Sequence, residues 1–498
     1  MKRVLQVGRR RWPARPGQCP GSNRTGTPGP EDESAADAYS RLQSGWGAFT
    51  RIPCRPNLEA TLGNAKSMTE DNGVAHGELN PAQAAMVAAR FDGAALLTGP
   101  AGSGKSLVLL HRALHFLEND PRARVALATV SAVHARRLET AFAALAGGRP
   151  GFASRMTIGS WQELAEELHG YVGGRVPVMA PPDLVRDTAA SALFDGGHVF
   201  DLDRMMAEWD QVIEAWRVRG EADYLCAPHP DGVAPLDISD RAALWPFIER
   251  IRSVLDGRMQ MSPGDLFARM ADYYADKADK PFDHVLIDES QDLSFIEARF
   301  AAAISPDGTD GLMLAGEESM RTMRPWIATE EAGIDLAGRL ERLPDPLRLP
   351  ATIQAFCDTL VVGRDGGSLP GRDGPLSFAA GEAIPGSLVS FAAARDGLAG
   401  RTAAIIWLTP EGRNCAREAM TLAGIEALGE PEEGRVAIMH ANEVKGLEFD
   451  AVAVTGFARR MLEPGEGGKR DARAALQRRM AHLACTRTKD TLLVCLQG

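Results

Sequence analysis

The sequence predicts an α/β protein with two blocks of parallel sheet, the first of which is interrupted by a mainly helical insertion. Short apolar runs with strand character recur along the chain and are separated by helical or turn segments. Between about residues 160 and 280 this alternation stops, and apolar residues recur at helical spacing instead. The chain has 498 residues, of which 45% are hydrophobic and 24% charged, so it has the composition of an ordinary globular protein with room for about three domains.

Residues 1–67 are predicted to form a disordered extension. The first 30 residues contain seven basic side chains and no acidic one, and they are rich in Pro, Gly and Arg. They lack the apolar core of a secretory signal, and the arginines at 9–11 are not followed by an apolar run. A solvated tail is the favoured interpretation and a contact with nucleic acid the alternative. A true start at Met68 is a further interpretation.

The first block is predicted to cover residues 68–149 and 281–338, with the helical insertion at 150–280. Its expected strands are Ala94–Thr98, Val125–Thr129, His284–Ile287 and Leu312–Ala315. In the insertion, one helical stripe consists of Met205, Met206, Trp209, Val212, Ile213 and Trp216. A second follows an expected cap at Asp240 and consists of Leu244, Trp245, Ile248, Ile251 and Val254. We interpret both stripes as core and not as a cofactor site.

The second block is predicted to cover residues 339–498. Its expected strands are Leu388–Phe391, Ala403–Leu408, Val436–His440, Ala451–Thr455 and Thr491–Cys495, with a helix at Asn414–Leu422. The seven cysteines form no C-x-x-C pair, which argues against a structural zinc site and indicates a cytoplasmic protein. No apolar stretch approaches the roughly 20 residues of a membrane span, so no membrane association is expected.

A phosphate-binding loop is indicated between the first expected strand and a helix expected at Ser106–Phe116. The pattern G-x-x-x-x-G-K-[ST] is formed by Gly99, Pro100, Ala101, Gly102, Ser103, Gly104, Lys105 and Ser106. Its glycines let backbone amides turn toward phosphate oxygens at the positive end of a helix. Lys105 would then reach the β- and γ-phosphates and Ser106 would ligate Mg²⁺. ATP and Mg²⁺ are therefore the expected cofactors.

An acidic pair is the second part of the predicted site. The expected strand His284–Ile287 is followed directly by Asp288 and Glu289. In this position one carboxylate can hold Mg²⁺ while its neighbour polarises the attacking water. We predict the metal role for Asp288 and the catalytic role for Glu289.

Ordered motifs across residues 78–498 resemble those of superfamily 1 helicases of the UvrD/Rep type. They are a Q motif at Leu79–Gln83, a D-E-x-Q-D box at Val285–Asp292, an arginine segment at Leu347–Pro350, a K-G-L-E-F signature at Val444–Asp450 and a second arginine box at Ala484–Lys489. The resemblance implies two RecA-like P-loop domains. It also implies that Gln83 reads adenine, that Glu448 belongs to the nucleotide site, and that Arg348 and Arg487 contact the γ-phosphate across a cleft.

The same resemblance implies a stepping motor that moves 3′ to 5′ on single-stranded DNA, with a role in DNA repair. A net charge of −11 does not oppose this, because binding needs only a local positive surface. Single-stranded DNA or a tailed duplex is the expected partner. The interval between Arg348 and Lys445 is too short for the large accessory insert of the bigger family members.

The nucleic-acid motifs depart from the family pattern. Met320 replaces a glutamine that links phosphate sensing to DNA, Met323 replaces a base-stacking aromatic, and Val130 replaces another. Since stacking is worth about 1–3 kcal/mol per base, a weak grip on the strand is expected. Trp161 and Trp326 are the candidate DNA contacts, and Trp161 is interpreted equally well as a core residue.

Three functions remain open at this point. The first is an ATP-dependent DNA helicase or translocase that needs a protein partner for processive unwinding. The second is a DNA-stimulated ATPase switch without strand separation, and the third is a regulatory subunit of a DNA repair or defence complex. We favour the first, because a non-catalytic subunit need not retain Lys105, Asp288, Glu289, Arg348 and Arg487 together.

Overall fold

The computed structural model of the chain describes residues 79–147, 149, 151–196, 200–229, 235–317, 321–322, 329–344, 349–362, 374–426, 428–458 and 472–497. The extension expected at 1–67 lies outside these residues, as do Met320, Met323, Trp326 and Arg348. The described residues divide into two compact units. We call the described residues between 178 and 262 the helical unit, and those on either side of it the sheet unit.

In the described part of the sheet unit, six parallel strands form a first sheet in the order β3-β2-β4-β5-β1-β6. The strands are β1 (Gly93–Thr98), β2 (Val125–Thr129), β3 (Met156–Ser160), β4 (His284–Ile287), β5 (Thr309–Ala315) and β6 (Leu340–Arg342). Every residue of β2 and β3 is buried. Strands covered on both faces read as continuous apolar runs, which is why the sequence predicted β2 and β4 with these same bounds.

The helices that belong with this sheet come before and after the helical unit in the sequence. They are α3 (Pro81–Ala88), α4 (Lys105–Asn119), α5 (Ala132–Ala146), α6 (Trp161–Gly173), α11 (Pro263–Ala275) and α12 (Phe295–Ile304), with 3₁₀ turns at η2 (Ala153–Arg155), η4 (Ser290–Asp292) and η6 (Thr329–Ala332). Helix α4 packs Val108 and Leu109 into the core formed with the β-strands. The phosphate loop is thus carried between a core strand and a core helix.

A second parallel sheet follows, and the structure describes five of its strands in the order β7-β11-β10-β8-β9. They are β7 (Leu376–Ala380), β8 (Ala403–Trp407), β9 (Val436–His440), β10 (Phe449–Ala458) and β11 (Thr488–Gln497). One face packs against α13 (Ala351–Val362) and α16 (Ala472–Cys485), and the other against α14 (Ala383–Ala393) and α15 (Pro410–Ala423). The chain is therefore an α/β protein with two parallel sheets.

One predicted strand is wrong. Leu388–Phe391 lies inside helix α14, and the strand near this position is β7. The buried residues of α14 are Ile384, Leu388, Phe391 and Ala392, whose spacing is that of one helical face. A mostly apolar segment of four residues cannot distinguish a strand from a buried helix, and only the spacing of apolar residues over the whole helix identifies it.

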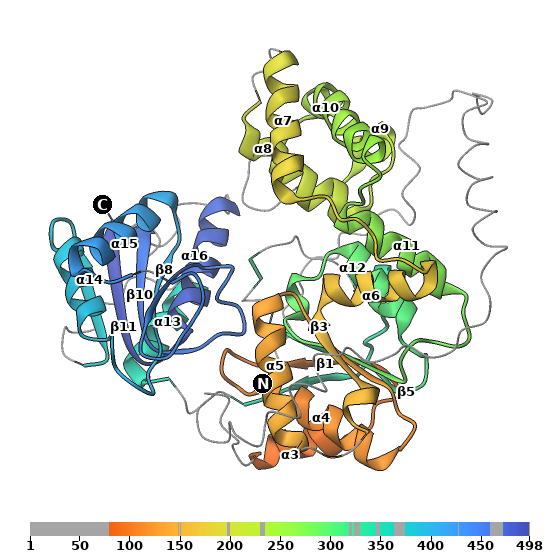
Figure 1. Cartoon of the computed structure of the whole chain (residues 1–498), viewed down its shortest axis with the longest axis horizontal. Helices are drawn as coiled ribbons and strands as arrows, with labels where there is room; N and C mark the ends of the chain where they lie inside the picture. The colour runs from red at the N-terminus through yellow and green to blue at the C-terminus, as the bar shows by residue number, and fades with distance from the viewer. Residues whose placement is uncertain are drawn as a thin grey trace, which may run out of the picture. The chain divides into compact units, whose positions relative to one another are not determined.

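The helical unit contains α7 (Pro182–Gly196), α8 (Leu202–Glu208), a π-helical turn η3 (Trp209–Glu214), α9 (Glu221–Cys226) and α10 (Ile238–Gly257), which are grouped together in Figure 1. Its core includes Met205, Trp209, Val212, Ile213, Leu244, Trp245, Ile248 and Ile251. Eight of the eleven residues in the two predicted stripes are thus core, while Met206 and Trp216 are partly buried against it and Val254 lies outside it. The predicted cap at Asp240 is wrong, because the N-cap of α10 is Asp237. The Asp237 side chain accepts a hydrogen bond from the backbone N–H of Asp240.

The helical unit is shorter than the span 150–280. Within that span β3 pairs with β2 in the first sheet, and α6 and α11 belong to the sheet unit. The described helices include none with the length and apolar character needed to cross a bilayer.

Candidate nucleotide site

The phosphate loop has a backbone that only glycine adopts readily. Gly99, Gly102 and Gly104 have φ of +151°, +76° and +88°. A Cβ on Gly99 would lie 2.8 Å from the Ser103 hydroxyl, so a side chain there would collide with the loop itself. Gly104 is the N-cap of α4 and makes no side-chain cap. The free amides at this helix start are therefore available to an anion.

Lys105 is folded onto its own loop. Its ammonium donates to the carbonyl oxygens of Gly99 at 2.6 Å and Pro100 at 3.1 Å. Burial lowers the pKa of Lys105, and the charges of Glu289, Asp288 and Glu317 act against that shift. A half-buried cation among three carboxylates, held by loop carbonyls, can exchange those carbonyls for phosphate oxygens.

Asp288 ends β4 with both carboxylate oxygens engaged. Its Oδ2 accepts hydrogen bonds from the Ser106 hydroxyl and from Nε2 of His134, the latter at 3.1 Å, while Oδ1 accepts the Glu289 amide at 2.9 Å. Burial alone would raise the pKa of this carboxyl, but the His134 and Ser106 contacts and the Lys105 charge hold it below its usual value. Asp288 is therefore held as a carboxylate beside Ser106.

These two residues suit the predicted metal. A hydroxyl and a carboxylate are the oxygen donors with which a P-loop protein holds Mg²⁺, and phosphate oxygens and waters complete the octahedron. Among the described residues no group of three or more His, Cys, Asp or Glu side chains could hold a metal ion by itself. The donor set of Ser106 and Asp288 thus fits a cation that arrives with a nucleotide.

Glu289 has a left-handed backbone with φ +54°, which is uncommon outside glycine. Its carboxylate accepts a hydrogen bond from the Gln291 amide. The side-chain oxygen of Gln291 accepts a hydrogen bond from the backbone N–H of Glu317 at 3.1 Å. The Glu317 carboxylate in turn accepts one from the backbone N–H of Gly99 at 3.3 Å. Glu289 is thereby connected to the loop through a short chain of hydrogen bonds.

Gln83 lies against the phosphate loop. It forms a capping box with Asn80 at the start of α3, and its side-chain amide donates to the Ser103 carbonyl at 3.0 Å. The structure therefore brings Gln83 together with the loop, as the sequence motif requires of a residue near the nucleotide.

One cation beside the second sheet contacts an acidic residue of the first, and another is affected by the charges of two more. Arg487 is buried, and its guanidinium donates to the Leu483 carbonyl at 3.1 Å and the Thr486 hydroxyl at 3.2 Å. Burial lowers the pKa of Arg487, and the charges of Glu289 and Asp288 oppose that shift. Lys445 forms an ion pair with Asp292 in which both side chains are almost fully buried.

The remaining residues predicted for the site are Trp161, Glu448, Arg348 and Trp326. Trp161 is 2% exposed and packs against Phe267 and Phe300, with ring centroids 6.5 and 5.0 Å away. This agrees with its interpretation as a core residue and gives no support to a base contact. Glu448 is half-buried just before β10. Arg348 and Trp326 lie outside the described residues.

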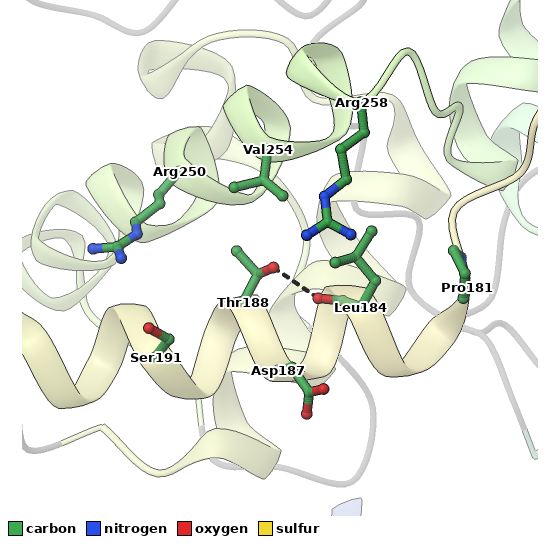
Figure 2. A pocket seen from close by; sticks show the side chains of 8 residues that line it. All are labelled: Pro181, Leu184, Asp187, Thr188, Ser191, Arg250, Val254 and Arg258. Carbon is green, nitrogen blue, oxygen red and sulfur yellow. Dashed lines mark hydrogen bonds between the residues drawn. The ribbon is translucent and has the colours of Figure 1, made fainter.

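A separate cavity of about 560 Å³ lies in the helical unit between α7 and α10 (Figure 2). None of its lining residues belongs to the predicted site. Arg250 on its rim pairs with Asp195 at 2.9 Å, and the Thr188 hydroxyl donates to the Leu184 carbonyl at 2.7 Å. These polar groups are already engaged within the helical unit.

His134 is the site residue that the sequence did not reveal. It occupies the first turn of α5, where the Ser131 hydroxyl caps the helix by accepting the His134 amide. The sequence offered no motif for it, because a single histidine on a helix is not distinguishable from a core residue. Only the approach of β4 places it on Asp288.

Comparison with known proteins agrees with this geometry. Residues 82–320 match the family model of an AAA domain, a match that spans the phosphate loop and the acidic pair. Over these residues the chain is therefore similar to P-loop domains of the AAA type. A search of curated proteins found no significant match. This similarity supports nucleotide binding, and Lys105, Ser106 and the acidic pair are residue types that hydrolysis of a nucleoside triphosphate requires.

Proposed function

We propose that this protein is an ATP-dependent DNA helicase or translocase of the superfamily 1 type. It would couple ATP hydrolysis between two RecA-like domains to 3′-to-5′ movement on single-stranded DNA, in the cytoplasm and in a DNA repair setting. The observation that supports this most strongly is Arg487. A cation carried by the second sheet is buried where the charges of Glu289 and Asp288 act on it.

The chemical step follows from the residues present. Loop amides and Lys105 bind the phosphates, and Lys105 leaves the carbonyls of Gly99 and Pro100 to do so. Ser106 and Asp288 would hold Mg²⁺, which when bound would neutralise charge on the phosphate oxygens. Glu289 accepts a proton from water as the water oxygen bonds to the γ-phosphorus. The bond to the β–γ bridging oxygen then breaks, which gives ADP and phosphate.

Arg487 and Arg348 are proposed to stabilise the charge of the departing phosphoryl group. Their effect requires the second sheet to be seated on the first, so ATP binding would favour closure and product release would favour opening. Two contacts could transmit this change: the Lys445–Asp292 ion pair and the hydrogen bond from the Thr322 hydroxyl to Asn442, 2.8 Å long. Asp292 lies only three residues after Glu289.

The alternative is a DNA-stimulated ATPase switch that does not separate strands. The burial of Trp161 favours it, because this aromatic is not presented to a base in the described structure. The substitutions Met320 and Met323 point the same way. A regulatory subunit of a DNA repair or defence complex is the third candidate, and a protein partner for processive unwinding remains part of the first proposal.

The deciding experiment measures ATP turnover by the full chain with and without single-stranded DNA. It then measures unwinding of duplexes with a 3′ or a 5′ tail. The motor predicts turnover that DNA stimulates modestly and weak unwinding of the 3′-tailed duplex only. Turnover that DNA stimulates without movement would favour the switch, and no turnover would favour the regulatory subunit. Glu289→Gln is the control, since it should retain ATP binding and lose cleavage.

A further inference from the structure

His134 is a buried histidine between the two sheets of the sheet unit. Its side chain is 5% exposed, and its Nε2 lies 3.1 Å from Oδ2 of Asp288. Because Asp288 also accepts from Ser106 and from the Glu289 amide, it is a carboxylate acceptor on both oxygens. Nε2 of His134 must therefore carry the proton in this contact.

The other ring nitrogen faces a different neighbour. Nδ1 of His134 is buried and has no hydrogen-bond partner. A Cβ built on Gly446 would overlap Nδ1, Cγ and Cδ2 of this ring, so the Gly446 backbone lies directly against the imidazole. Gly446 has φ +68°, a backbone conformation that favours glycine. The imidazole beside it also leaves no space for a Cβ.

Gly446 is not an isolated neighbour. The preceding residue, Lys445, forms the buried ion pair with Asp292. The segment that precedes β10 is therefore attached to the acidic box at Asp292 and rests on His134, which in turn holds Asp288. One imidazole lies between the carboxylate expected to hold Mg²⁺ and the backbone of the second sheet.

We propose that His134 is a positioning residue that orients Asp288 for Mg²⁺ and makes this orientation depend on the seating of Gly446. The proposal rests on the proposed function only as far as Mg²⁺ and adenine nucleotide are ligands of the site. Ser106 would ligate the metal through a lone pair of its hydroxyl oxygen, and its O–H can still donate to Asp288. His134 is the second side-chain donor to this carboxylate and approaches it from the side of the second sheet.

The consequence is measurable without turnover. Loss of a group that orients a metal ligand typically weakens metal affinity by about 10- to 100-fold. The Mg²⁺ concentration that gives half of the ADP-dependent rise in melting temperature should therefore increase by that factor in His134→Ala. It should stay near wild type in His134→Gln, because the glutamine amide nitrogen replaces Nε2 as a donor.

Gly446→Ala tests the second half of the proposal. Its Cβ would displace the ring, so the Mg²⁺ requirement should rise as it does in His134→Ala, although no atom of the metal site has been changed. His115→Ala is the matched control, since His115 contacts Asn119 on α4 and none of the site residues. The rise with ADP alone, without Mg²⁺, should be equal in all variants.

The outcome that overturns the proposal is an unchanged Mg²⁺ midpoint in His134→Ala or in Gly446→Ala. If His134→Ala does not fold, His134→Gln and His134→Asn replace it, because only the longer amide reaches Asp288; equal midpoints for the two would then overturn the proposal. Absence of DNA movement in the wild type would remove the motor proposal and leave this measurement intact. The two failures are therefore distinguishable.

Discussion

Two cations, the half-buried Lys105 and the buried Arg241, are held in opposite ways. In the helical unit, Arg241 donates to the carbonyl oxygens of Tyr224 at 2.9 Å and Pro228 at 2.8 Å, at the end of α9, and lies 3.5 Å from the buried Glu208. Lys105 in the sheet unit donates only to carbonyls of its own glycine-rich loop. The first cation is fixed by helix ends that the fold itself places, and the second by groups that a ligand can replace.

The difference separates a cation that stabilises the fold from one that is proposed to bind a ligand. Arg112 follows the Arg241 pattern: it donates to the carbonyls of Met86 and Ala89, both at 2.7 Å, and pairs with Asp310 at 2.6 Å. Burial of a charge therefore does not by itself mark a site in this protein. What marks Lys105 is a glycine-rich loop, a helix start and a surplus of carboxylates around the cation.

The largest expected effect is on catalysis. Lys105→Ala should reduce ATP turnover by at least about 100-fold, because a preorganised charge on the transferring phosphate is removed. Its free energy of unfolding in urea should change by less than about 1 kcal/mol, since the loop carbonyls can turn to water. A large loss of stability in this variant would place Lys105 in the same class as Arg241 and break the comparison.

The reverse result is expected at Arg241. Arg241→Met leaves Glu208 and the α9 carbonyls without their buried cation, so the free energy of unfolding should fall by about 3–5 kcal/mol. ATP turnover per folded molecule should remain at the wild-type value. Arg250→Met is the control: Arg250 pairs with Asp195 at the surface, and its loss should cost less than about 1 kcal/mol. Equal losses in the two variants would contradict the structural role.

A smaller effect concerns the surroundings of Arg487. Burial, with the Arg487 charge as the second cause, lowers the pKa of His482 to about 4. A histidine with a lowered folded-state pKa contributes stability above its ordinary value of 6.5, and this stability is lost as pH falls toward 4. The melting temperature of His482→Gln should therefore depend less on pH between 6.5 and 4 than that of the wild type. Parallel curves would show that His482 is not buried as a neutral ring.

The smallest effect is expected for the double substitution Met320→Gln, Met323→Tyr. It restores a polar link and a stacking face, so the ratio of ATP turnover with and without single-stranded DNA should rise. Basal turnover without DNA should stay constant, because neither residue is assigned to the chemical step. Strong stimulation already in the wild type, with no further rise, would show that other residues grip the strand. Both methionines lie outside the described residues, and this prediction rests on the sequence.

The sequence predicted those parts of the molecule in which neighbouring residues decide the outcome. Strands β2, β4 and β9 are continuous apolar runs and have their predicted bounds. The phosphate loop and the acidic pair were found because their spacing along the chain is itself the chemical requirement. Part of helix α14 was predicted as a strand, because four residues cover only about one helical turn and do not show the helical spacing of apolar residues.

The parts that could not be predicted depend on long-range packing. No sequence motif around His134 indicates its contact with Asp288, which is 154 residues away in the chain. The choice between core and surface for Trp161 was likewise open until Phe267 and Phe300 were placed around it. The strand β6 has only three residues, none of them buried, so its pairing with β1 left no apolar signal.

The order of strands in the two sheets also sets a schedule for biosynthesis. Among the described strands of the second sheet, β7 pairs only with β11, the last of the five to leave the ribosome. In the first sheet β1 pairs with β5 and β6, which are made after the whole helical unit. The helical unit has mostly short-range contacts, so it can fold before β5 and β6, the partners of β1, have been synthesised. The nascent chain therefore carries exposed apolar strand edges for a long time, and a chaperone would protect the half-made sheets.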